Sequence, residues 1–341
     1  MKCTIQNIAD HLGLSRNTVS KALKNSSEVS ENTRNLVIKT ASKLGYKNAT
    51  FATPVIPASE TGSNGTILFL TRTYASDSEF WTTVLRGIES ILSNANYHLA
   101  ISIMSDSDLK QLNFPQTISD SSIKGIILVE ICDKVVCDAL SQFNLPIVSV
   151  DMPNVPFEEL NGIDVVTMES KKNLKKIINQ LIEKGAESFG FVGDLYSPNV
   201  SRGFQERYNA LSECLAEHQL PLNQKNCLLH QTPEDFRNFQ TTVNNLQAMI
   251  SLPDVFICGN DWTAIQLIYA LQFLGFQIPK DICVVGFDNI PAASRISPSL
   301  TTISTPQKYL GIAAARQILE RIQHPNCPHV FCQYETELIC L

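Results

Sequence analysis

The stretch TIQNIADHLGLSRNTVSKALKNSSEVSENTRNLVIKTASKLGY, residues 4–46, decides the fold of the first part of the chain. Its apolar side chains recur three and four positions apart, which predicts three short helices. Gly13 supplies the turn between the first two, because glycine adopts a left-handed backbone without steric cost. Thr4, Ser15 and Ser30 stand where the helices begin, and short hydroxyls cap helix N-termini. The pattern predicts a helix-turn-helix.

The second predicted helix presents a polar face to its surroundings. The predicted inward-facing residues are Ile5, Ile8, Ala9 and Leu12, then Val19, Ala22 and Leu23, and finally Leu36, Val37, Thr40, Ala41 and Leu44. Arg16, Asn17 and Lys21 therefore point outward near the start of the second helix. A second helix that opens with Arg and Asn and is lined by small hydroxyls suits a major groove. We predict a protein that binds specific DNA sequences.

Basic residues concentrate in this segment although the whole chain is acidic. The 341 residues carry a formal net charge of −6, whereas residues 1–47 contain eight Lys or Arg against three acidic residues. The segment is thus +5 and the remainder −11. A basic module joined to an acidic body is typical of a nucleic-acid-binding protein. The alternative is a helical hairpin with a solvated basic face.

Composition limits the remaining possibilities. The chain is long enough for about two to three domains. No apolar run approaches the roughly 20 residues of a membrane span, and no signal-peptide h-region precedes residue 4. The ten cysteines form no CxxC pair, and the six histidines lack metal-ligand spacing. We expect a cytoplasmic protein with reduced thiols, no metal, no cofactor and no membrane segment.

The composition changes between residues 47 and 65. KNATFATPVIPASETGSNG contains two prolines, two glycines and several Ser and Thr, which is typical of a linker. We therefore predict a DNA-binding domain over 1–47, a linker or hinge over 48–65 and a sensor domain over 66–341.

Beyond the linker, short apolar strands alternate with helices. Strands are predicted at 66–70, 98–104, 125–131, 146–150, 165–168, 189–193, 254–259 and 282–287, with helices at 80–95, 170–184, 204–218 and 261–274. Continuous apolar strands bounded by helices imply parallel sheets covered on both faces. The series runs twice, which predicts an α/β fold of two doubly wound lobes. The first lobe is expected over about 66–164 and 307–334, and the second over about 165–303 and 335–341. In such folds ligands bind outside the carboxyl ends of the strands, here between the lobes.

An ordered set of motifs resembles the lactose/galactose repressor (LacI-type) family along nearly the whole chain. After the helix-turn-helix stretch come LRGIE (85–89), LIEKG (181–185), FGFVG (189–193), GNDWTA (259–264), VVGFDNIP (284–291) and SPSLTTISTP (297–306), in the family's order. The resemblance implies a three-helix helix-turn-helix headpiece joined to a two-lobed, periplasmic-binding-protein-like sensor. It also implies a transcriptional regulator, a repressor, whose affinity for operator DNA is controlled by a small molecule.

The resemblance assigns roles in the headpiece. Ser15, Arg16, Asn17 and Lys21 correspond to positions that face base edges. Arg16 suits a bidentate contact with guanine, and Asn17 one with adenine. Phosphate contacts fall on four residues with short polar side chains, Thr4, Thr18, Asn25 and Thr33. The alternative for these four is ordinary helix capping. The expected DNA partner is a double-stranded, pseudo-palindromic operator bound by a homodimer.

The resemblance also assigns an effector site between the lobes. The residues it assigns are Phe80, Trp81, Glu169, Arg207, Asn260 and Asp288. Aromatic faces suit the apolar faces of a sugar ring, and a carboxylate, a guanidinium and an amide supply the hydrogen bonds a buried polyol needs. An aromatic pair at a helix start can also be core, and charged residues can form a surface ion pair. The effector is expected to be a carbohydrate, or alternatively a purine-type corepressor.

The sequence departs from the family in places. Glu169 stands where an Asp is usual, Ala210 replaces a glycine and Thr305 replaces a common Gln, so the effector need not be that of a familiar relative. The linker lacks the family's leucine, and its two prolines disfavour a helix, so we expect an extended or disordered linker.

Two competing functions have less support. An enzyme would need a nucleophile, base or metal constellation, and the sequence has no GxGxxG, P-loop or GxSxG motif. A transport solute-binding protein would carry a signal peptide and lack the headpiece.

Overall fold

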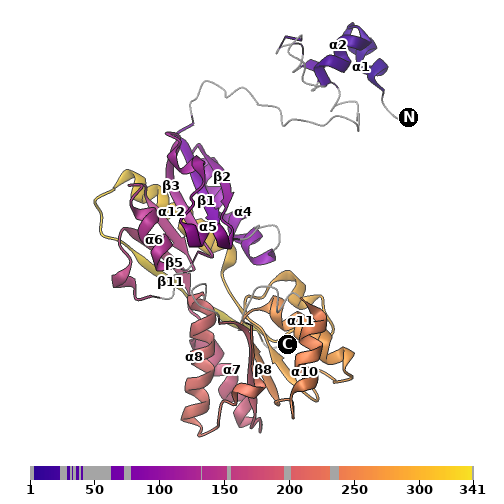
Figure 1. Cartoon of the computed structure of the whole chain (residues 1–341), viewed down its shortest axis with the longest axis vertical. Coiled ribbons are helices and arrows are strands. Elements are labelled where there is room, and N and C mark those ends of the chain that lie inside the picture. Colours follow the sequence, from indigo (N-terminus) through magenta and orange to yellow (C-terminus); the bar gives the residue numbers. More distant parts are fainter. Residues whose placement is uncertain are drawn as a thin grey trace. The chain divides into compact units, whose positions relative to one another are not determined.

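The structure is a computed structural model that describes residues 4–23, 29–30, 33, 36–37, 40, 63–72, 78–131, 133–151, 155–195, 201–230 and 238–339. The chain divides into two compact units, Met1–Gly62 and Ser63–Leu341, drawn in Figure 1. The boundary falls within the segment predicted as a linker. Asn25 and the expected extended linker lie outside the described residues.

The first unit contains the predicted helix-turn-helix. α1 (Ile5–Leu12) begins with a capping box between Thr4 and Asn7 and ends at Gly13, whose φ of 63° is left-handed. α2 (Arg16–Leu23) follows directly. The two helices share one small core of Ile8, Ala9, Val19, Ala22, Val29 and Val37, with Ile5, Leu12, Leu14 and Leu23 packed against it. The apolar spacing of both helices is thereby confirmed.

The third predicted helix is described only at single positions. Val37 and Thr40 are buried, as predicted. Leu36 is 51% exposed, so its predicted inward position is wrong. Leu36 directly precedes the buried Val37, and neighbouring helical residues lie about 100° apart around the axis, so both need not face the same core. Ala41 and Leu44 lie outside the described residues.

The second unit contains two parallel sheets. The first sheet has six strands among the described residues, in the order β11 (Phe331–Tyr334), β5 (Ile163–Met168), β4 (Ile147–Val150), β3 (Ile123–Val129), β1 (Gly65–Thr71) and β2 (Tyr97–Ile103). Its helices are α4 (Glu79–Asn94), α5 (Asp106–Gln111), α6 (Lys134–Ser141) and α12 (Gln307–Gln323). All of its paired strands run parallel.

The second sheet has the order β7 (Leu228–His230), β6 (Phe189–Asp194), β8 (Val255–Cys258) and β9 (Cys283–Val285), and it too is parallel. Its helices are α7 (Lys172–Glu183), α8 (Arg202–Glu217), α10 (Phe239–Ala248) and α11 (Asp261–Phe273). β10 (Thr302–Ser304) and β12 (Glu337–Ile339) form an antiparallel pair. Short 3-10 turns occur at η2 (Gln116–Ser119), η3 (Phe157–Glu159), η4 (Gln224–Asn226) and η5 (Pro291–Ser294).

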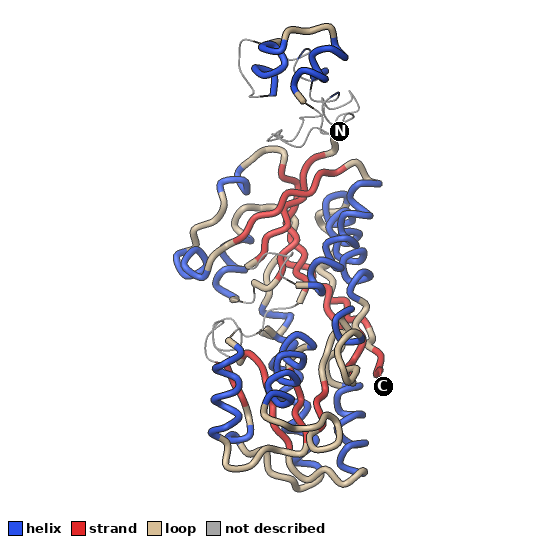
Figure 2. Tube along the Cα trace, turned by 90° about the vertical axis from the view of Figure 1, so that its right-hand side faces the viewer, coloured by secondary structure: helices blue, strands red, loops and turns tan. Residues whose placement is uncertain are grey.

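Alternate residues of β1 explain why the first sheet is covered on both faces. Ile67 and Phe69 join the core that includes residues of α4 and α12, whereas Leu68 and Leu70 join the core that includes residues of α6. Successive side chains of a strand point to opposite faces, so an unbroken apolar strand requires two covers. Figure 2 shows the strands lying between helices. α4 and α12 approach closely at Gly311, where a Cβ atom would lie 2.0 Å from the Val84 carbonyl oxygen.

One strand lies in a different lobe from the one predicted. The alternation placed 165–168 at the start of the second series, but β5 pairs with β4 and β11 in the first sheet. The sequence indicates that a segment is a strand, but it does not indicate which strands pair with it. Here the partner at the edge of the sheet is β11, residues 331–334. The chain therefore passes between the sheets three times, after β5, between β10 and α12, and between β11 and β12.

A buried ion pair holds the returning segment against β5. Both oxygens of Asp164 accept hydrogen bonds from Arg321 of α12, from Nε at 2.9 Å and Nη2 at 2.8 Å, and both side chains are buried. The Val330 N–H donates to Asp164 at 2.8 Å, and Arg321 also donates to the Pro328 carbonyl at 2.8 Å. Burial alone would raise the pKa of Asp164, but the hydrogen bonds from Arg321 and Val330 outweigh it and lower the pKa. The pair joins β5, α12 and β11.

We expect Asp164→Asn to reduce the free energy of unfolding by about 3–5 kcal/mol, because Arg321 would be left as a buried, unpaired charge. Since the pKa of Asp164 is lowered on folding, its contribution is present above the unfolded pKa of about 4 and is lost as pH falls below it. Urea denaturation at neutral and acidic pH measures both effects. Asp138→Asn, which breaks the exposed pair with Lys134, is the matched control and should cost less than about 1 kcal/mol. Equal losses in the two variants would contradict the assignment.

Candidate functional site

The exposed face of α2 carries the residues predicted to read bases. Ser15, Arg16, Asn17 and Lys21 are all exposed, while the neighbouring Val19 is buried. Arg16 and Asn17 lie in the first turn of α2, which contains no acidic residue. The helix therefore presents a guanidinium, an amide and an ammonium from one surface, as direct reading of base edges requires.

The hydroxyls predicted to contact phosphate already take part in helix caps. The Ser15 Oγ accepts a hydrogen bond from the Thr18 N–H at 3.1 Å and lies 2.8 Å from the Thr18 hydroxyl. Thr4 caps α1 through Asn7, and Thr33 pairs with Ser30 at 2.8 Å. These contacts fit the capping alternative, and they also place backbone N–H groups at the helix starts, where a phosphate oxygen can approach.

In the second unit, acidic or amide residues follow the carboxyl ends of several parallel strands. Glu130 follows β3, Asp151 follows β4, Glu169 follows β5, Asn260 lies just beyond β8, and Asp288 lies just beyond β9. Parallel strands of one sheet bring their carboxyl ends to the same edge, and this edge is where ligands bind in open α/β folds. The two sheets thus each supply polar residues of the kind that hold a ligand.

Arg207 of α8 is the buried cation of this region. Only 3% of it is exposed, its Nη1 donates to the Gly259 carbonyl oxygen at 2.6 Å, and its guanidinium lies 3.6 Å from the centroid of the Phe287 ring. Its buried Nε has no hydrogen-bond partner among the described residues. Burial lowers the pKa of Arg207, and the carboxylates of Asp288 and Asp151 oppose that shift. A buried donor without a partner costs free energy, so the site is suited to an incoming acceptor.

Asp288 is held in a fixed backbone conformation. Its φ is 117°, and its carbonyl oxygen accepts hydrogen bonds from Gln307 Nε2 at 2.6 Å and from the Thr305 hydroxyl at 3.2 Å. The residue is 7% exposed, and burial raises its pKa well above the ordinary value while Arg207 opposes the rise. Asp261 fixes the following loop by accepting the Ile290 N–H at 2.9 Å. A non-glycine residue in this conformation is strained, and such strain is frequent at ligand sites.

The predicted aromatic pair begins α4. The Phe80 and Trp81 rings are 4.7 Å apart and edge to face, with 6% and 7% of each residue exposed. The Trp81 Nε1 donates to Glu130 Oε1 at 2.6 Å. The pair therefore belongs in part to the core, which was the alternative interpretation, and its ring orientation is set by Glu130.

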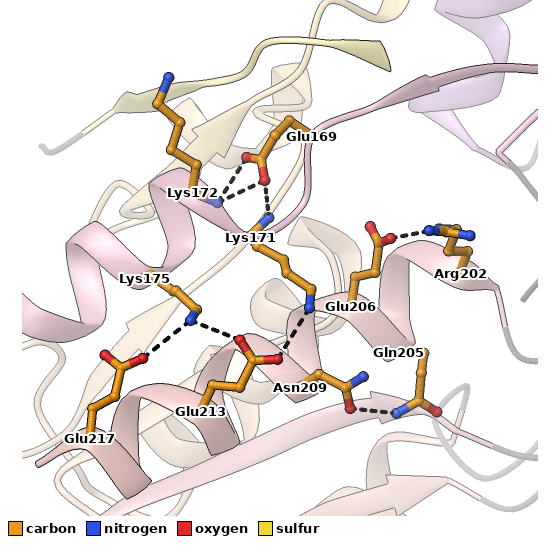
Figure 3. A network of polar contacts seen from close by, with 10 residues as sticks. All are labelled: Glu169, Lys171, Lys172, Lys175, Arg202, Gln205, Glu206, Asn209, Glu213 and Glu217. Atoms are coloured by element: carbon orange, nitrogen blue, oxygen red, sulfur yellow. Dashed lines mark hydrogen bonds and ion pairs between the residues drawn. The ribbon is translucent and has the colours of Figure 1, made fainter. Parts of the chain in front are cut away.

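Glu169 and Asn260 have structural partners. Figure 3 shows the Glu169 carboxylate at the start of α7, where it accepts the N–H groups of Lys171 at 2.7 Å and Lys172 at 2.8 Å. The Oδ1 of Asn260 accepts the Thr263 N–H at 2.9 Å and caps α11. An effector that contacts Glu169 must share its carboxylate with the N–H groups of α7. An effector that contacts Asn260 must share its Oδ1 with the Thr263 N–H or use the amide N–H of Asn260. The sequence interpretation overlooked both caps.

Figure 3 also shows the polar surface that α7 and α8 share. Lys175 pairs with Glu213 at 2.7 Å and with Glu217 at 3.5 Å, and Lys171 pairs with Glu213 at 3.2 Å. The side chains are partly exposed, so solvent screens these pairs and they contribute little stability.

Sequence interpretation missed two carboxylates of the site. Glu130 and Asp151 both adopt a left-handed backbone, with φ of 56° and 69°. A Cβ atom at Gly203 would lie 3.1 Å from Arg207 Nη2 and 3.6 Å from Asp151 Oδ1, so these two groups flank one point. Burial raises the pKa of Asp151 to about 6; Arg207 opposes this rise, and Glu130 adds to it. An acidic residue directly after a buried strand was the signal available in the sequence.

One further contact beside this site joins α4, which covers the first sheet, to η5, which follows the last strand of the second sheet. Glu79, the first residue of α4, accepts the Ala292 N–H of η5 at 2.9 Å and lies 3.8 Å from Arg295 Nη1. Glu79 precedes the aromatic pair, and η5 follows Asp288 by three residues. The contact therefore links the two elements that carry candidate ligand residues.

Family models match both parts of the chain. Residues 4–48 match the model of bacterial regulatory proteins of the lacI family, and residues 178–339 match the periplasmic binding protein-like domain. The chain belongs to the lacI family of bacterial regulatory proteins. The predicted resemblance and the predicted α/β fold with a helix-turn-helix are thus confirmed.

Relatives match nearly the full length of this family member. It is 27% identical over 327 residues to the ribose operon repressor of Haemophilus influenzae, covering 95% of this chain and 93% of that protein. It is 27% identical over 341 residues to catabolite control protein A of Staphylococcus xylosus, covering 96% and 97%. It is 25% identical over 341 residues to the repressor PurR of Photobacterium profundum, covering 98% and 97%.

Solved structures have the same fold at low identity. A complex of the transcriptional regulator CelR with cellobiose has a TM-score of 0.69 at 18% identity and covers 99% of both chains. The lac repressor dimer bound to operator and the anti-inducer ONPF has a TM-score of 0.68 at 18% identity, covering 100% and 98%. A LacI family regulator of Enterococcus faecium with bound ribose has a TM-score of 0.66 at 24% identity, covering 81% and 97%.

Membership of this family defines the class of function. The chain is a DNA-binding transcriptional regulator and not an enzyme, as predicted. Within the described part of the chain, no helix is long and apolar enough to cross a membrane. The same residues contain no group of His, Cys, Asp and Glu that could hold a metal ion.

We expect Asp151→Asn to raise the stability of the ligand-free protein at about pH 8, by about 1–2 kcal/mol after allowance for partial exposure. The pKa of Asp151 is raised to about 6 by folding, so ionisation opposes folding, and stability falls as pH rises from the unfolded pKa of about 4 through 6. Thermal unfolding of both proteins from about pH 4 to 8 measures the difference, which should disappear at the acidic end. A variant that is equally destabilised at every pH would contradict this.

We expect Glu79→Ala to expose the Ala292 amide, because that N–H loses a charged acceptor. Hydrogen exchange of the peptide over 288–296 should accelerate by about tenfold. Glu89→Ala, at an exposed position of the same helix, serves as the control and should leave this peptide unchanged. Equal exchange in the two variants would mean that Glu79 does not hold α4 and η5 together.

Proposed function

We propose that this regulator is a cytoplasmic repressor that binds its operator as a homodimer and responds to a small carbohydrate bound between the two sheets' elements. The observation that carries the proposal is the convergence of Arg207 with Asp151 and Asp288. One buried guanidinium with a spare donor and two carboxylates come from elements of both sheets. They supply donors and acceptors in the alternation that a polyol needs.

The carbohydrate has further support. Phe80 and Trp81 lie at the start of α4, where Trp81 donates to Glu130, and the faces of such rings suit the C–H faces of a sugar. Among proteins of known structure with this fold, one regulator holds ribose and another is a complex with cellobiose. A relative of similar length is named for the ribose operon.

A purine-type corepressor is the second candidate. The chain is also similar to the repressor PurR of Photobacterium profundum. Aromatic rings, a carboxylate and an amide could hold a planar base as well as a sugar. A thermal-shift screen of the full chain against pentoses, hexoses, disaccharides, hypoxanthine and guanine separates the two candidates, because a bound ligand raises the melting temperature. Stabilisation by a base and by none of the sugars would reject the carbohydrate proposal.

We expect Asp288→Ala to abolish the response to the stabilising effector while leaving operator affinity nearly unchanged, because the residue is buried among the effector groups and not in the headpiece. A ligand shifts a conformational equilibrium only through its different affinities for the two states. Calorimetry measures effector binding, and fluorescence anisotropy measures operator binding. Asp138→Ala, at a partly exposed site on α6 away from the effector groups, is the control and should behave as wild type. Unaltered effector affinity in Asp288→Ala would remove that residue from the site.

In the headpiece, we propose that Ser15, Arg16, Asn17 and Lys21 face base edges, and that Thr4, Thr18, Asn25 and Thr33 approach phosphates. Two-fold symmetry of a homodimer maps onto two half-sites, so operators selected from random DNA should be pseudo-palindromic. Selected sites with a single half-site would contradict the dimer.

We expect Arg16→Ala to weaken binding to the selected operator by about 1–3 kcal/mol and to relax the preference at one base position in each half-site. The reason is the loss of a bidentate contact with a guanine. Gln6→Ala, at an exposed position of α1, is the control and should keep the preference. Uniform weakening on all sequences would make Arg16 a phosphate contact instead.

A further inference from the structure

We infer that the effector carries no phosphate or carboxylate group: the site takes an uncharged polyol or one that bears an amine. The inference rests on the proposed sensing of a carbohydrate and specifies which carbohydrates fit. It follows from the charges that meet at the strand ends and from the partners of the basic residues nearby.

Three carboxylates lie at the ends of strands where a ligand would bind. Glu130 and Asp151 end neighbouring strands of the first sheet, and Asp288 ends a strand of the second. All three have positive φ, a backbone conformation that non-glycine residues rarely adopt. The Glu130 carboxylate is further held by the Trp81 Nε1 at 2.6 Å.

The positive charge available to a ligand is smaller. Arg207 is buried, with Nη1 bound to the Gly259 carbonyl and Nε without a partner in the described structure. Two other arginines near the strand ends have acidic partners. Arg72 donates to Asp106 at 2.7 Å, and Arg202 donates to Glu206 at 2.6 Å and to the Val155 carbonyl at 3.1 Å. Among the described residues, the acidic side chains that act most strongly on Arg207 are those of Asp288, Asp151, Glu206 and Asp261, so acidic groups outnumber this cation.

This balance excludes anions and admits hydroxyls. A phosphate or carboxylate beside Arg207 would also meet Asp151, which flanks the same point next to Gly203. Like charges in a site removed from water repel strongly because little solvent screens them. A hydroxyl can accept from the spare donor of Arg207 and donate to a carboxylate at the same time. An ammonium group would also reduce the excess negative charge.

The test uses Trp81 as the reporter in the full chain. The protein has two tryptophans, so Trp262→Phe leaves Trp81 alone. Fluorescence titrations compare D-ribose with D-ribose 5-phosphate, and D-galactose with D-galacturonate and D-galactosamine. Within a set that binds, we expect the anionic member to bind about 100-fold more weakly than its neutral partner or not at all. Equal or tighter binding of the anionic member would overturn the inference while leaving carbohydrate sensing intact.

A second measurement does not depend on the identity of the sugar. Inorganic phosphate, titrated against chloride at constant ionic strength, should leave Trp81 fluorescence and the melting temperature of the Trp262→Phe protein unchanged. Adding Glu130→Gln and Asp151→Asn, singly and together, should create phosphate binding, because Arg207 then faces fewer negative charges. Asp138→Asn is the matched surface control and should not.

The outcomes of the two measurements separate the proposals. Phosphate binding by the protein with both carboxylates intact would overturn the inference, and so would carboxylate variants that bind phosphate no better. If no sugar binds and the phosphate results are as expected, the carbohydrate effector is rejected, but the inference that the site excludes anions is kept. Because each carboxylate is replaced by its own amide, a folded single variant keeps the test decisive if the double variant fails to fold.

Discussion

Parallel strands joined by helices leave only their ends free, and this constraint places the carboxylates of the candidate effector site in the sensor. The faces of the first sheet are covered, as the division of β1 side chains between two cores demonstrates. A polar group inside a strand would be buried without water, whereas one just past the carboxyl end can meet a ligand. Glu130, Asp151 and Asp288 occupy such positions in left-handed backbone. The chain passes between the two sheets three times, so groups from both can act on one molecule.

Arg207 is costly to bury, and its surroundings explain why it remains charged. Removing a guanidinium from water costs several kcal/mol unless opposite charges and hydrogen bonds compensate. The Phe287 ring, the Gly259 carbonyl and the carboxylates of Asp151 and Asp288 supply part of that compensation. They leave Nε unsatisfied. A ligand that accepts from this donor completes the set, so effector binding and the stability of the assembled site are thermodynamically linked. The carboxylates are also why the completing group should be a hydroxyl and not an anion.

Most strands and the first two helices could be predicted, because apolar spacing reports directly which side chains are buried. Strand pairing could not be predicted. Residues 165–168 read as a strand, but the partner β11 lies more than 160 residues later, so the predicted sheet is wrong. Leu36 was misplaced because one apolar residue beside Val37 does not define a face. Motif positions also predicted Arg207 and Asp288 as effector residues, and the structure shows that both are buried. Hydrogen bonds to backbone N–H groups, such as those that Glu169 accepts at α7, depend on geometry that the sequence does not display.

The start of α4 and the loop from Asp288 to η5 carry candidate ligand residues, and the same two segments also contact each other. Glu79 accepts from Ala292, and its chain neighbours are Phe80 and Trp81. On the other side, Ala292 lies four residues after Asp288, and between them the Ile290 N–H donates to Asp261. If the effector touches the aromatic pair and Asp288, as proposed, it would favour the arrangement in which Glu79 and Ala292 meet. Because a ligand shifts an equilibrium only by its differential affinity, such an effector would favour the sensor conformation in which this contact is made. The contact is partly exposed, so it is weak enough for a small ligand to decide the balance.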